Sequence, residues 1–321
     1  MQLPGYLGVD IGGTKIAVVR GNASGVPQES VTFPSGPPEK SLPQIMRELQ
    51  KFGADETSVI GVACGDPLDR IKGEILSPPN LPGWDKVEMV HALEAEFLCK
   101  AYLMNDANAG ALAEWKFGAG EQSNHMVFVT AGTGFGAGLM INGLLVEGAS
   151  GSAGEIGHVR LAADGPVGYG KAGSVEGFCS GGGIAQLAQA VASANDGAVS
   201  FNRKKIENIT TEDVAKAAQK GDEKALQLFR DVGYRYGEAL AILVDILNPE
   251  KIVLGSIFVR CRNLLEPAMR EVLEREALSR SAAICEIVPA QLDEEIGNYA
   301  ALAVAWYRNR GNSLHPRMGE K

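Results

Sequence analysis

The stretch that decides the fold is "YLGVDIGGTKIAVVRG", residues Tyr6 to Gly21, in which two apolar, β-branched runs flank the pair Gly12-Gly13. Such runs on either side of a glycine turn are typical of a β-hairpin. Downstream, residues 58–68 read as a buried strand, and residues 41–53 and 86–100 have the apolar spacing of helices. Strands that alternate with helices predict an α/β layer fold.

The opening pattern occurs a second time. Residues 125–148, "HMVFVTAGTGFGAGLMINGLLVEG", again read as strand, glycine turn, strand, and "GAGEQS" (118–123) marks a boundary before them. We interpret this repetition as a weak internal duplication. The expected domains are residues 1–118, completed by a C-terminal helix at about 297–310, and a larger domain of residues 119–296.

Composition narrows the class of protein. The chain has 321 residues, of which 45% are hydrophobic, and a net charge of -9, which argues against a nucleic-acid partner. No apolar run approaches the roughly 20 residues that span a bilayer, so we expect no membrane partner. The start of the chain resembles no signal peptide, and no helix-turn-helix segment precedes the first strand. Five dispersed cysteines, without paired spacing, predict reduced, buried thiols in a cytoplasmic protein.

Two glycine turns are candidate phosphate sites. In "DIGGTK" (10–15), glycines let backbone N–H groups approach a phosphate, Thr14 adds a hydroxyl, and Asp10 can hold a hydrated Mg²⁺. In "TAGTGFGAG" (130–138), alternate glycines leave one strand face bare, and Thr133 offers a second hydroxyl. A plain tight hairpin and close strand packing are the alternatives. Two such turns, one per domain, favour a polyphosphate gripped from both sides of a cleft.

A third motif, "NDANAGALAE", lies where a strand gives way to a helix. The carboxylate of Asp106 can accept a proton from a hydroxyl group there, while the Asn105 amide contacts a neighbouring hydroxyl. Taken alone, the motif is better explained as an Asx turn that caps the helix.

Taken in order, these motifs resemble the ROK family of sugar kinases, repressors and related proteins, within the actin-like, hexokinase-type ATPase superfamily. The resemblance extends over nearly the whole chain and also includes "SPPNLPGW" (77–84), "GEIGH" (154–158), "NPEKIVLGS" (248–256) and "GNYAALAVA" (297–305). It implies two actin-like (ribonuclease H-like) α/β domains with a cleft between them.

The resemblance also implies roles for individual residues. Asp106 is the catalytic base that accepts the proton of the sugar hydroxyl. The sugar-binding residues are Asn80, Asn105, Asp106, Glu155, His158 and Glu176. ATP and Mg²⁺ are bound by Asp10, Gly12, Gly13, Thr14, Lys15, Gly132, Thr133 and Gly134, with Gly255 near the adenosine. A homodimer is expected, because family members usually dimerise.

The sequence departs from the family in the loop after His158. Most members carry three cysteines there, which with the histidine bind Zn²⁺ tetrahedrally. Here Val167, Tyr169 and Ser174 stand at those positions, so we predict no zinc. We expect His158 to be free for a sugar hydroxyl or Glu155, and packing around Val167 and Tyr169 to support the loop instead.

A smaller departure is "LGSIF", where Ser256 and Ile257 replace further glycines and leave the nucleotide contacts and the phosphoryl donor open. The expected activity is ATP-dependent phosphorylation of glucose or a related hexose at its 6-hydroxyl. An N-acetylglucosamine, N-acetylmannosamine, fructose or allose kinase is the alternative, and a catalytically silent sugar-binding regulator is a further one.

Overall fold

The computed structural model describes residues 5–202 and 205–311. Contacts between residues divide the chain into two compact units. The first comprises Met1–Glu121, Glu147–Gly151 and Glu294–Lys321, and the second comprises Gln122–Val146 and Ser152–Asp293. The domain limits expected from the sequence, 1–118 with 297–310 and 119–296, stay a prediction.

The first unit is built on a five-stranded sheet with the order β3-β2-β1-β4-β7. The pairs β1–β2 and β2–β3 are antiparallel, whereas β1–β4 and β4–β7 are parallel. The strands are β1 (Tyr6–Ile11), β2 (Lys15–Gly21), β3 (Pro27–Pro34), β4 (Val59–Cys64) and β7 (Lys100–Asn105), with a separate ladder of β5 (Leu68–Asp69) and β6 (Glu74–Ile75). The helices are α1 (Pro38–Lys51), α2 (Met89–Phe97), α3 (Asp106–Phe117) and α10 (Ile296–Gly311).

The second unit repeats this sheet, in the order β10-β9-β8-β13-β14. The pairs β8–β9 and β9–β10 are antiparallel, and the pairs β8–β13 and β13–β14 are parallel, as at the corresponding places in the first sheet. The strands are β8 (Met126–Ala131), β9 (Phe135–Ile141), β10 (Leu144–Val146), β13 (Lys251–Leu254) and β14 (Glu286–Pro289), with a ladder of β11 (Val167–Gly168) and β12 (Lys171–Ala172). The repeated topology agrees with the interpretation of an internal duplication.

Helices of the second unit fill the sequence between these strands. They are η1 (Ile156–His158), α4 (Val175–Cys179), α5 (Gly181–Ser193), η2 (Ile206–Asn208), α6 (Thr211–Gln219), α7 (Glu223–Leu247), α8 (Ile257–Glu276) and α9 (Ser279–Ala282). The short helix η3 (Asp293–Glu295) spans the limit between the two units in the sequence and leads into α10. The α/β prediction is confirmed, and every helix and strand named from the sequence is present. Strands β3 and β14 were not foreseen, since β3 is an edge strand with a mostly exposed face and β14 has only four residues.

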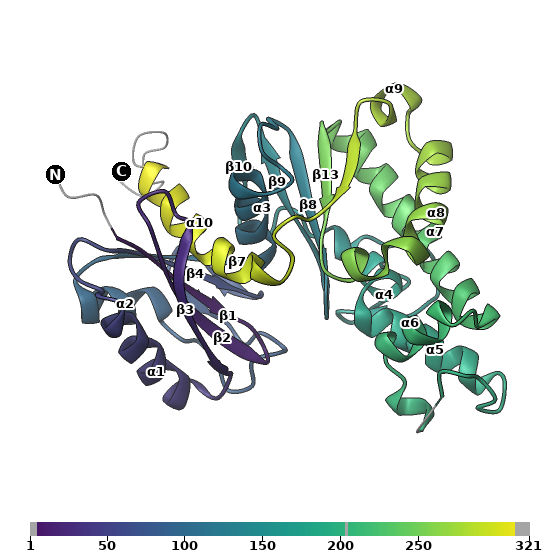
Figure 1. Ribbon diagram of the computed structural model, residues 1–321, viewed down its shortest axis with the longest axis horizontal. Coiled ribbons are helices and arrows are strands. Elements are labelled where there is room, and N and C mark those ends of the chain that lie inside the picture. Colours follow the sequence, from purple (N-terminus) through teal and green to yellow (C-terminus); the bar gives the residue numbers. More distant parts are fainter. Residues whose placement is uncertain (1–4, 203–204, 312–321) are drawn as a thin grey trace. The chain divides into compact units, whose positions relative to one another are not determined.

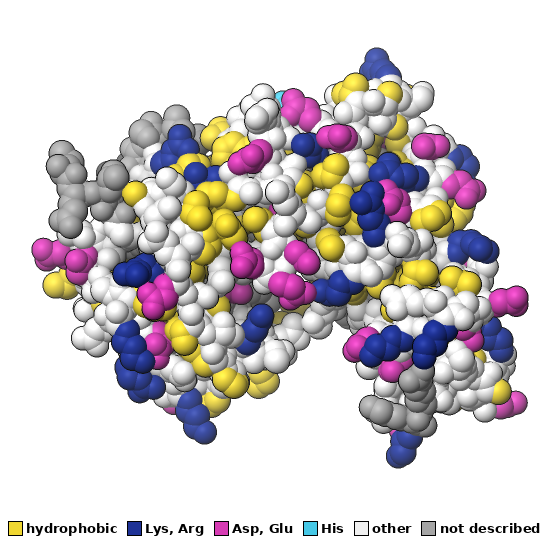
Figure 2. Space-filling view, viewed as in Figure 1, with side chains coloured by type: hydrophobic (Ala, Val, Ile, Leu, Met, Phe, Trp, Pro, Cys, Tyr) yellow, Lys and Arg dark blue, Asp and Glu magenta, His cyan; other side chains and the backbone are white. Residues whose placement is uncertain are grey.

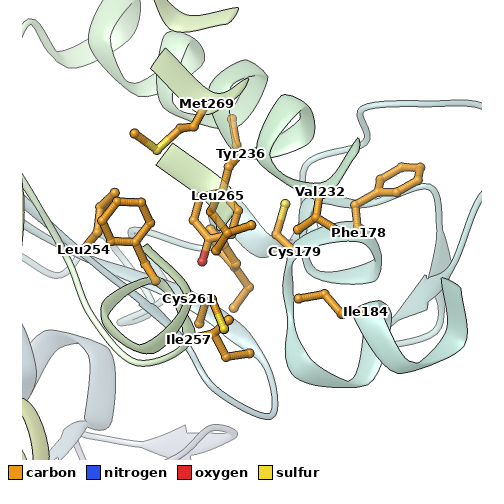
Figure 3. Close-up of a cluster of buried hydrophobic side chains, with 14 of the residues drawn as sticks. Phe178, Cys179, Ile184, Val232, Tyr236, Leu254, Ile257, Cys261, Leu265 and Met269 are labelled. Carbon is orange, nitrogen blue, oxygen red and sulfur yellow. The ribbon is translucent and has the colours of Figure 1, made fainter. Parts of the chain in front are cut away.

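The core of the second unit lies among α4, α5, α7 and α8 (Figure 3). Cys179 and Cys261 lie beside Tyr236 in this cluster, and all three are buried. All five cysteines of the chain are free, and four of them are buried while Cys285 is partly exposed. The prediction of unpaired, mostly buried thiols is therefore confirmed. Among the residues that the structure describes, no helix combines the length and apolar character needed to cross a membrane.

The last helix of the chain completes the first unit. Helix α10, yellow in Figure 1, packs on β1, β4 and α3, whose residues lie near the start of the chain. Glycine in the middle of β4 permits this approach, because a Cβ on Gly61 would lie 2.1 Å from the carbonyl oxygen of Ala301. The alanines of α10 are correspondingly buried, including Ala301 and Ala305. Small residues on both elements thus let helix and sheet backbones come into direct contact.

We expect Gly61→Ala to destabilise the protein by roughly 2 kcal/mol or more, since the added methyl meets backbone atoms that cannot move independently. Gly36→Ala is the matched control, because its Cβ would meet only Ser41 Oγ, at 3.6 Å. Urea unfolding measures both variants. Equal unfolding midpoints for the two would contradict the proposed packing of α10 on β4.

Candidate functional site

The predicted site residues of the first unit gather at one edge of its sheet. Asp10 lies near the end of β1, Asp66 follows β4, and Asn105 ends β7. Strands β1, β4 and β7 are parallel neighbours, with Asp10 opposite Ala63 and Cys64 opposite Asn105. The carboxyl ends of parallel strands in open α/β sheets are where ligands usually bind.

Asn105 and Asp106 form the junction between β7 and α3. The Asn105 side-chain oxygen accepts hydrogen bonds from the N–H groups of Ala107 (2.9 Å) and Asn108 (3.2 Å), so it caps the helix. Its amide nitrogen donates to Asp66 Oδ2 at 2.6 Å. The capping alternative for this motif is therefore confirmed for Asn105, and a sugar contact by this residue would use its amide N–H.

Asp106 is the first residue of α3, and its side chain is exposed. Its carboxylate accepts a hydrogen bond from the N–H of Ala107 at 2.8 Å. Although the side chain touches solvent, the low-dielectric protein packed around it raises the pKa of its carboxyl above the ordinary value. A solvent-accessible carboxylate with a raised pKa is a suitable general base.

Asp10 lies in a strongly unfavourable environment for a carboxylate. Burial raises its pKa from 3.8 to about 6; the charge of Asp106 raises it further, and Lys15 opposes the shift. The start of α10 also approaches it closely, because a Cβ on Gly297 would lie 2.2 Å from Asp10 Oδ2. The Asp10 carboxylate fits a hydrated magnesium ion, since carboxylate oxygens are ligands that Mg²⁺ prefers and a divalent cation would offset the repulsion from Asp106.

The first glycine turn contacts another predicted site residue. Gly12 N–H bonds to the carbonyl of Lys15 at 3.0 Å, which closes the hairpin. Gly13 lies against Asn80, because a Cβ at Gly13 would come within 2.7 Å of Asn80 Cβ. Thr14 and Lys15 are exposed, so a hydroxyl and an ammonium group are available to an anion. In the first unit, the structure thus brings Asn80 to the turn that the sequence assigns to phosphate.

The second glycine turn is hydrogen-bonded to the helices α4 and α5 of its unit. The carbonyl of Gly132 accepts a hydrogen bond from Gly181 N–H, at the start of α5, at 2.9 Å. Glu176 Oε2 accepts one from Phe135 N–H at 3.0 Å. A Cβ on Gly134 would lie 2.9 Å from the same oxygen. The turn is therefore in direct contact with a residue that the resemblance assigns to the sugar, and Thr133 beside it is exposed.

The other sugar-side residues of this unit stand on η1 and α4. Glu155 directly precedes η1 and His158 ends it, and both are exposed, whereas Glu176 is half-buried in α4. A backbone hydrogen bond from Val175 N–H to the carbonyl of Val159 ties the two segments together at 2.9 Å. The ring of His158 lies edge-on to Tyr169, with centroids 6.4 Å apart.

Gly255 is buried where β13 ends, and its N–H donates to the carbonyl of Val129 at 2.8 Å. The next residue, Ser256, has a positive φ of 56°. Its hydroxyl shares a hydrogen bond of 3.0 Å with Thr130, just before the second glycine turn. The residue assigned to the adenosine therefore lies next to the turn assigned to the phosphates.

The loop after His158 does not fit a zinc ion. Val167 and Tyr169 offer no ligand, and the hydroxyl of Ser174 accepts a hydrogen bond from Gly177 N–H. Across residues 5–202 and 205–311, no three His, Cys, Asp or Glu side chains are grouped so that they could hold a metal. The expected packing around Val167 and Tyr169 is wrong, since these side chains are 50% and 67% exposed. Backbone hydrogen bonds hold this loop instead.

Two residues at the site of the first unit were missed from the sequence. Asp66 stands two residues after the buried strand β4, at the edge where Asn105 also lies, and that position is the signal that could have found it. Gly297 stands in the first turn of a helix, where glycine is unfavourable unless something approaches closely. Here the approaching group is the Asp10 carboxylate.

Comparison with known proteins places the chain. The ROK family model matches residues 6–307. A glucokinase of Halalkalibacterium halodurans is 31% identical over 304 residues, 91% of this chain and 92% of the relative. The ROK hexokinase of Thermus thermophilus superposes with a TM-score of 0.81 at 26% identity, covering 95% of this chain and 99% of the other.

A Streptomyces griseus ROK glucokinase, solved with glucose and AMPPNP, has a TM-score of 0.76 at 26% identity, covering 94% of this chain and 99% of the other. Repressors are also among the relatives. The DNA-binding regulator NagC of Escherichia coli is 30% identical over 253 residues, which is 76% of this chain and 60% of NagC.

The fold and these relatives define an actin-like, ATP-dependent sugar kinase. The chain belongs to the ROK family.

Because burial raises the pKa of Asp10, the stability of the folded chain should depend on pH. The Asp10 carboxyl has a pKa near 6 in the folded chain and near 3.8 when unfolded, so its contribution to stability is lost as the pH rises from about 4 through 6. Asp10→Asn removes the charge. We expect this variant to gain melting temperature relative to the original chain at pH 7.5 but much less at pH 4, by calorimetry without added metal. A difference that is the same at both pH values would contradict the assigned environment.

Proposed function

We propose that the protein transfers the γ-phosphoryl group of ATP to the 6-hydroxyl of a hexose, as a glucokinase does, with Asp106 as the general base. The observation that carries the proposal is the position of Asp106. Its carboxylate is exposed at the carboxyl ends of the parallel strands β1, β4 and β7, its pKa is raised, and its neighbour Asn105 is fixed by Asp66 and by the helix cap. The glucose-bound relative from Streptomyces griseus supports a hexose as the acceptor.

The proposed step is simple in terms of atoms. Asp106 takes the proton of the sugar hydroxyl as that oxygen forms a bond to the γ-phosphorus of ATP, and the bond from phosphorus to the bridging oxygen of ADP breaks. Such transfer needs positioning and charge neutralisation more than covalent chemistry. A raised pKa strengthens Asp106 as a base, and the hydrogen bond from the Ala107 N–H in the first turn of α3 opposes the shift by favouring the carboxylate form.

We assign the phosphates to Gly12, Gly13, Thr14 and Lys15 of the first unit and to Gly132, Thr133 and Gly134 of the second. The exposed hydroxyl and ammonium groups of the first turn, and the exposed Thr133, support this assignment. Gly255 would lie near the adenosine. Asp10 would hold Mg²⁺ through water, and the ion would supply charge neutralisation at the phosphates.

We assign the sugar to Asn80, Asn105, Glu155, His158 and Glu176, together with Asp106. Carboxylates and amides recognise vicinal hydroxyls by paired hydrogen bonds, and a misplaced hydroxyl leaves a buried group unpaired. The contact between Gly13 and Asn80, and that between Glu176 and the second glycine turn, support a sugar bound beside the phosphates.

A sugar-sensing regulator is the second candidate, because repressors are among the relatives. The charge of the chain argues against it. The net charge is -9, and Lys and Arg side chains are interspersed with Asp and Glu on the face that Figure 2 shows. DNA binding instead needs basic side chains clustered on one surface.

We further propose that the protein is a cytoplasmic homodimer. The five free cysteines support the location, and light scattering of the purified protein tests the dimer.

A coupled ADP-release assay over glucose, mannose, fructose, allose, N-acetylglucosamine and N-acetylmannosamine tests the activity. We expect glucose to give the highest kcat/KM. Preference for an N-acetylhexosamine would replace the proposed substrate while keeping the kinase. Sugar binding without ADP release for any member of the panel would favour the regulator.

We expect Asp106→Asn to lower kcat by about 10²–10⁴-fold, the usual contribution of a general base, with little change in sugar affinity. Asp196→Asn is the matched control, since Asp196 is an exposed aspartate of the second unit with a positive φ that asparagine tolerates. Steady-state kinetics and sugar titration measure both. Undiminished kcat in Asp106→Asn would exclude Asp106 as the base.

A further inference from the structure

The loop of residues 158–177 carries His158 at its start and Glu176 near its end, yet its outer side chains are exposed. Val167 and Tyr169 protrude into solvent, so apolar burial cannot hold the loop in place. Hydrogen bonds and one ring contact hold the loop instead. They occur at or beside Val167, Tyr169 and Ser174, the three positions at which the family pattern has cysteines, and none of them needs a metal.

At the first position, Val167 is bound through its backbone by Gln186 of α5. Its N–H donates to Gln186 Oε1 at 2.9 Å, and its carbonyl accepts from Gln186 Nε2 at 2.9 Å. The side chain of Gln186 therefore pairs with Val167 as a neighbouring strand would. Because α5 is part of the core, this pairing fixes the tip of the loop to the body of the unit.

At the second position, the ring of Tyr169 lies edge-on to that of His158. The neighbouring Lys171 donates from Nζ to the carbonyl of His158 at 2.7 Å. An ammonium group at this place also disfavours a cation beside His158, since like charges repel. Lys171 thus fixes the backbone of the residue that would otherwise serve as a metal ligand.

At the third position, Ser174 is fully buried and caps the helix that bears Glu176. Its hydroxyl oxygen accepts a hydrogen bond from Gly177 N–H, and its O–H donates one to the carbonyl of Lys171, both at 3.1 Å. Arg160 adds a bond from its guanidinium to the carbonyl of Ala172 at 2.9 Å. The direction of α4, and with it the carboxylate of Glu176, is therefore set by hydrogen bonds within the loop.

We propose that residues 158–177 form a metal-free clasp in which Gln186, Lys171 and Ser174 act as positioning residues for His158 and Glu176. The clasp takes the structural place of zinc in this chain. Its role in sugar binding rests on the proposed function, whereas its existence as a hydrogen-bonded unit does not.

The test compares Gln186→Ala with Gln189→Ala in the full chain. Gln189 lies on the same helix and also donates to backbone carbonyls, but these are the carbonyls of Glu207 and Ile209, outside the clasp. Hydrogen–deuterium exchange of residues 158–177 reports the clasp, and the KM values for hexose and for ATP report its effect on the site. Lys171→Met is the second variant, in case Gln186→Ala yields little folded protein.

We expect Gln186→Ala and Lys171→Met to raise exchange within residues 158–177 at least about tenfold by local opening. They should also raise the hexose KM by about tenfold through misplacement of the sugar contacts, with the KM for ATP nearly unchanged. Gln189→Ala should change neither.

Exchange at the original rate in both clasp variants would overturn the clasp itself. Raised exchange with an unchanged hexose KM, or an equal rise of that KM in Gln189→Ala, would overturn its positioning role. If the original chain phosphorylates no hexose, the proposed function fails, and the exchange result still decides whether the clasp exists.

Discussion

The hydrogen bond from Phe135 N–H to the Glu176 carboxylate, 3.0 Å long, joins the two chemical halves of the site in the second unit. Phe135 follows the glycine turn that we assign to phosphate, and Glu176 stands on the short helix that we assign to the sugar. Glycine at position 134 leaves room for this carboxylate, which a Cβ there would meet at 2.9 Å. Because one oxygen of Glu176 is held by the turn, the clasp and the turn must keep a fixed spacing. A hydrogen bond to a charged group contributes about 1.5–3 kcal/mol, which favours this one spacing.

The site in the first unit differs, because it brings together two carboxyl groups, those of Asp10 and Asp106. Burial of Asp10, and then the nearby charge of Asp106, raise the pKa of the Asp10 carboxyl to about 6. The amide of Asn105 donates a hydrogen bond of 2.6 Å to Asp66, and the Asn105 side-chain oxygen caps the start of α3. The hydrogen bonds therefore hold the start of α3, and with it Asp106, in place. Carboxylates held in fixed positions favour the binding of a cation and the positioning of a base.

Much of this could be predicted from the sequence because the pattern is local. The apolar runs around Gly12-Gly13 gave the first hairpin, and the same pattern at residues 125–148 gave the second. What could not be predicted depends on groups far apart in the chain. The bond between Asp66 and Asn105 spans 39 residues, and the approach of Gly297 to Asp10 links the two ends of the chain. The loop after His158 was expected to rely on packing at Val167 and Tyr169, but a glutamine 19 residues beyond Val167 binds its backbone instead. The spacing of apolar residues in the sequence does not predict a hydrogen bond between a side chain and a distant backbone group.

The hydrogen bonds of the clasp are expected to hold residues 158–177 in this ROK-family chain without zinc. The most direct measurement is the zinc content of the purified protein, together with kcat/KM for its best hexose before and after treatment with 1,10-phenanthroline in excess Mg²⁺. We expect zinc well below one ion per chain and an unchanged kcat/KM. One tightly bound zinc per chain, whose removal lowers kcat/KM and whose return restores it, would overturn the metal-free clasp.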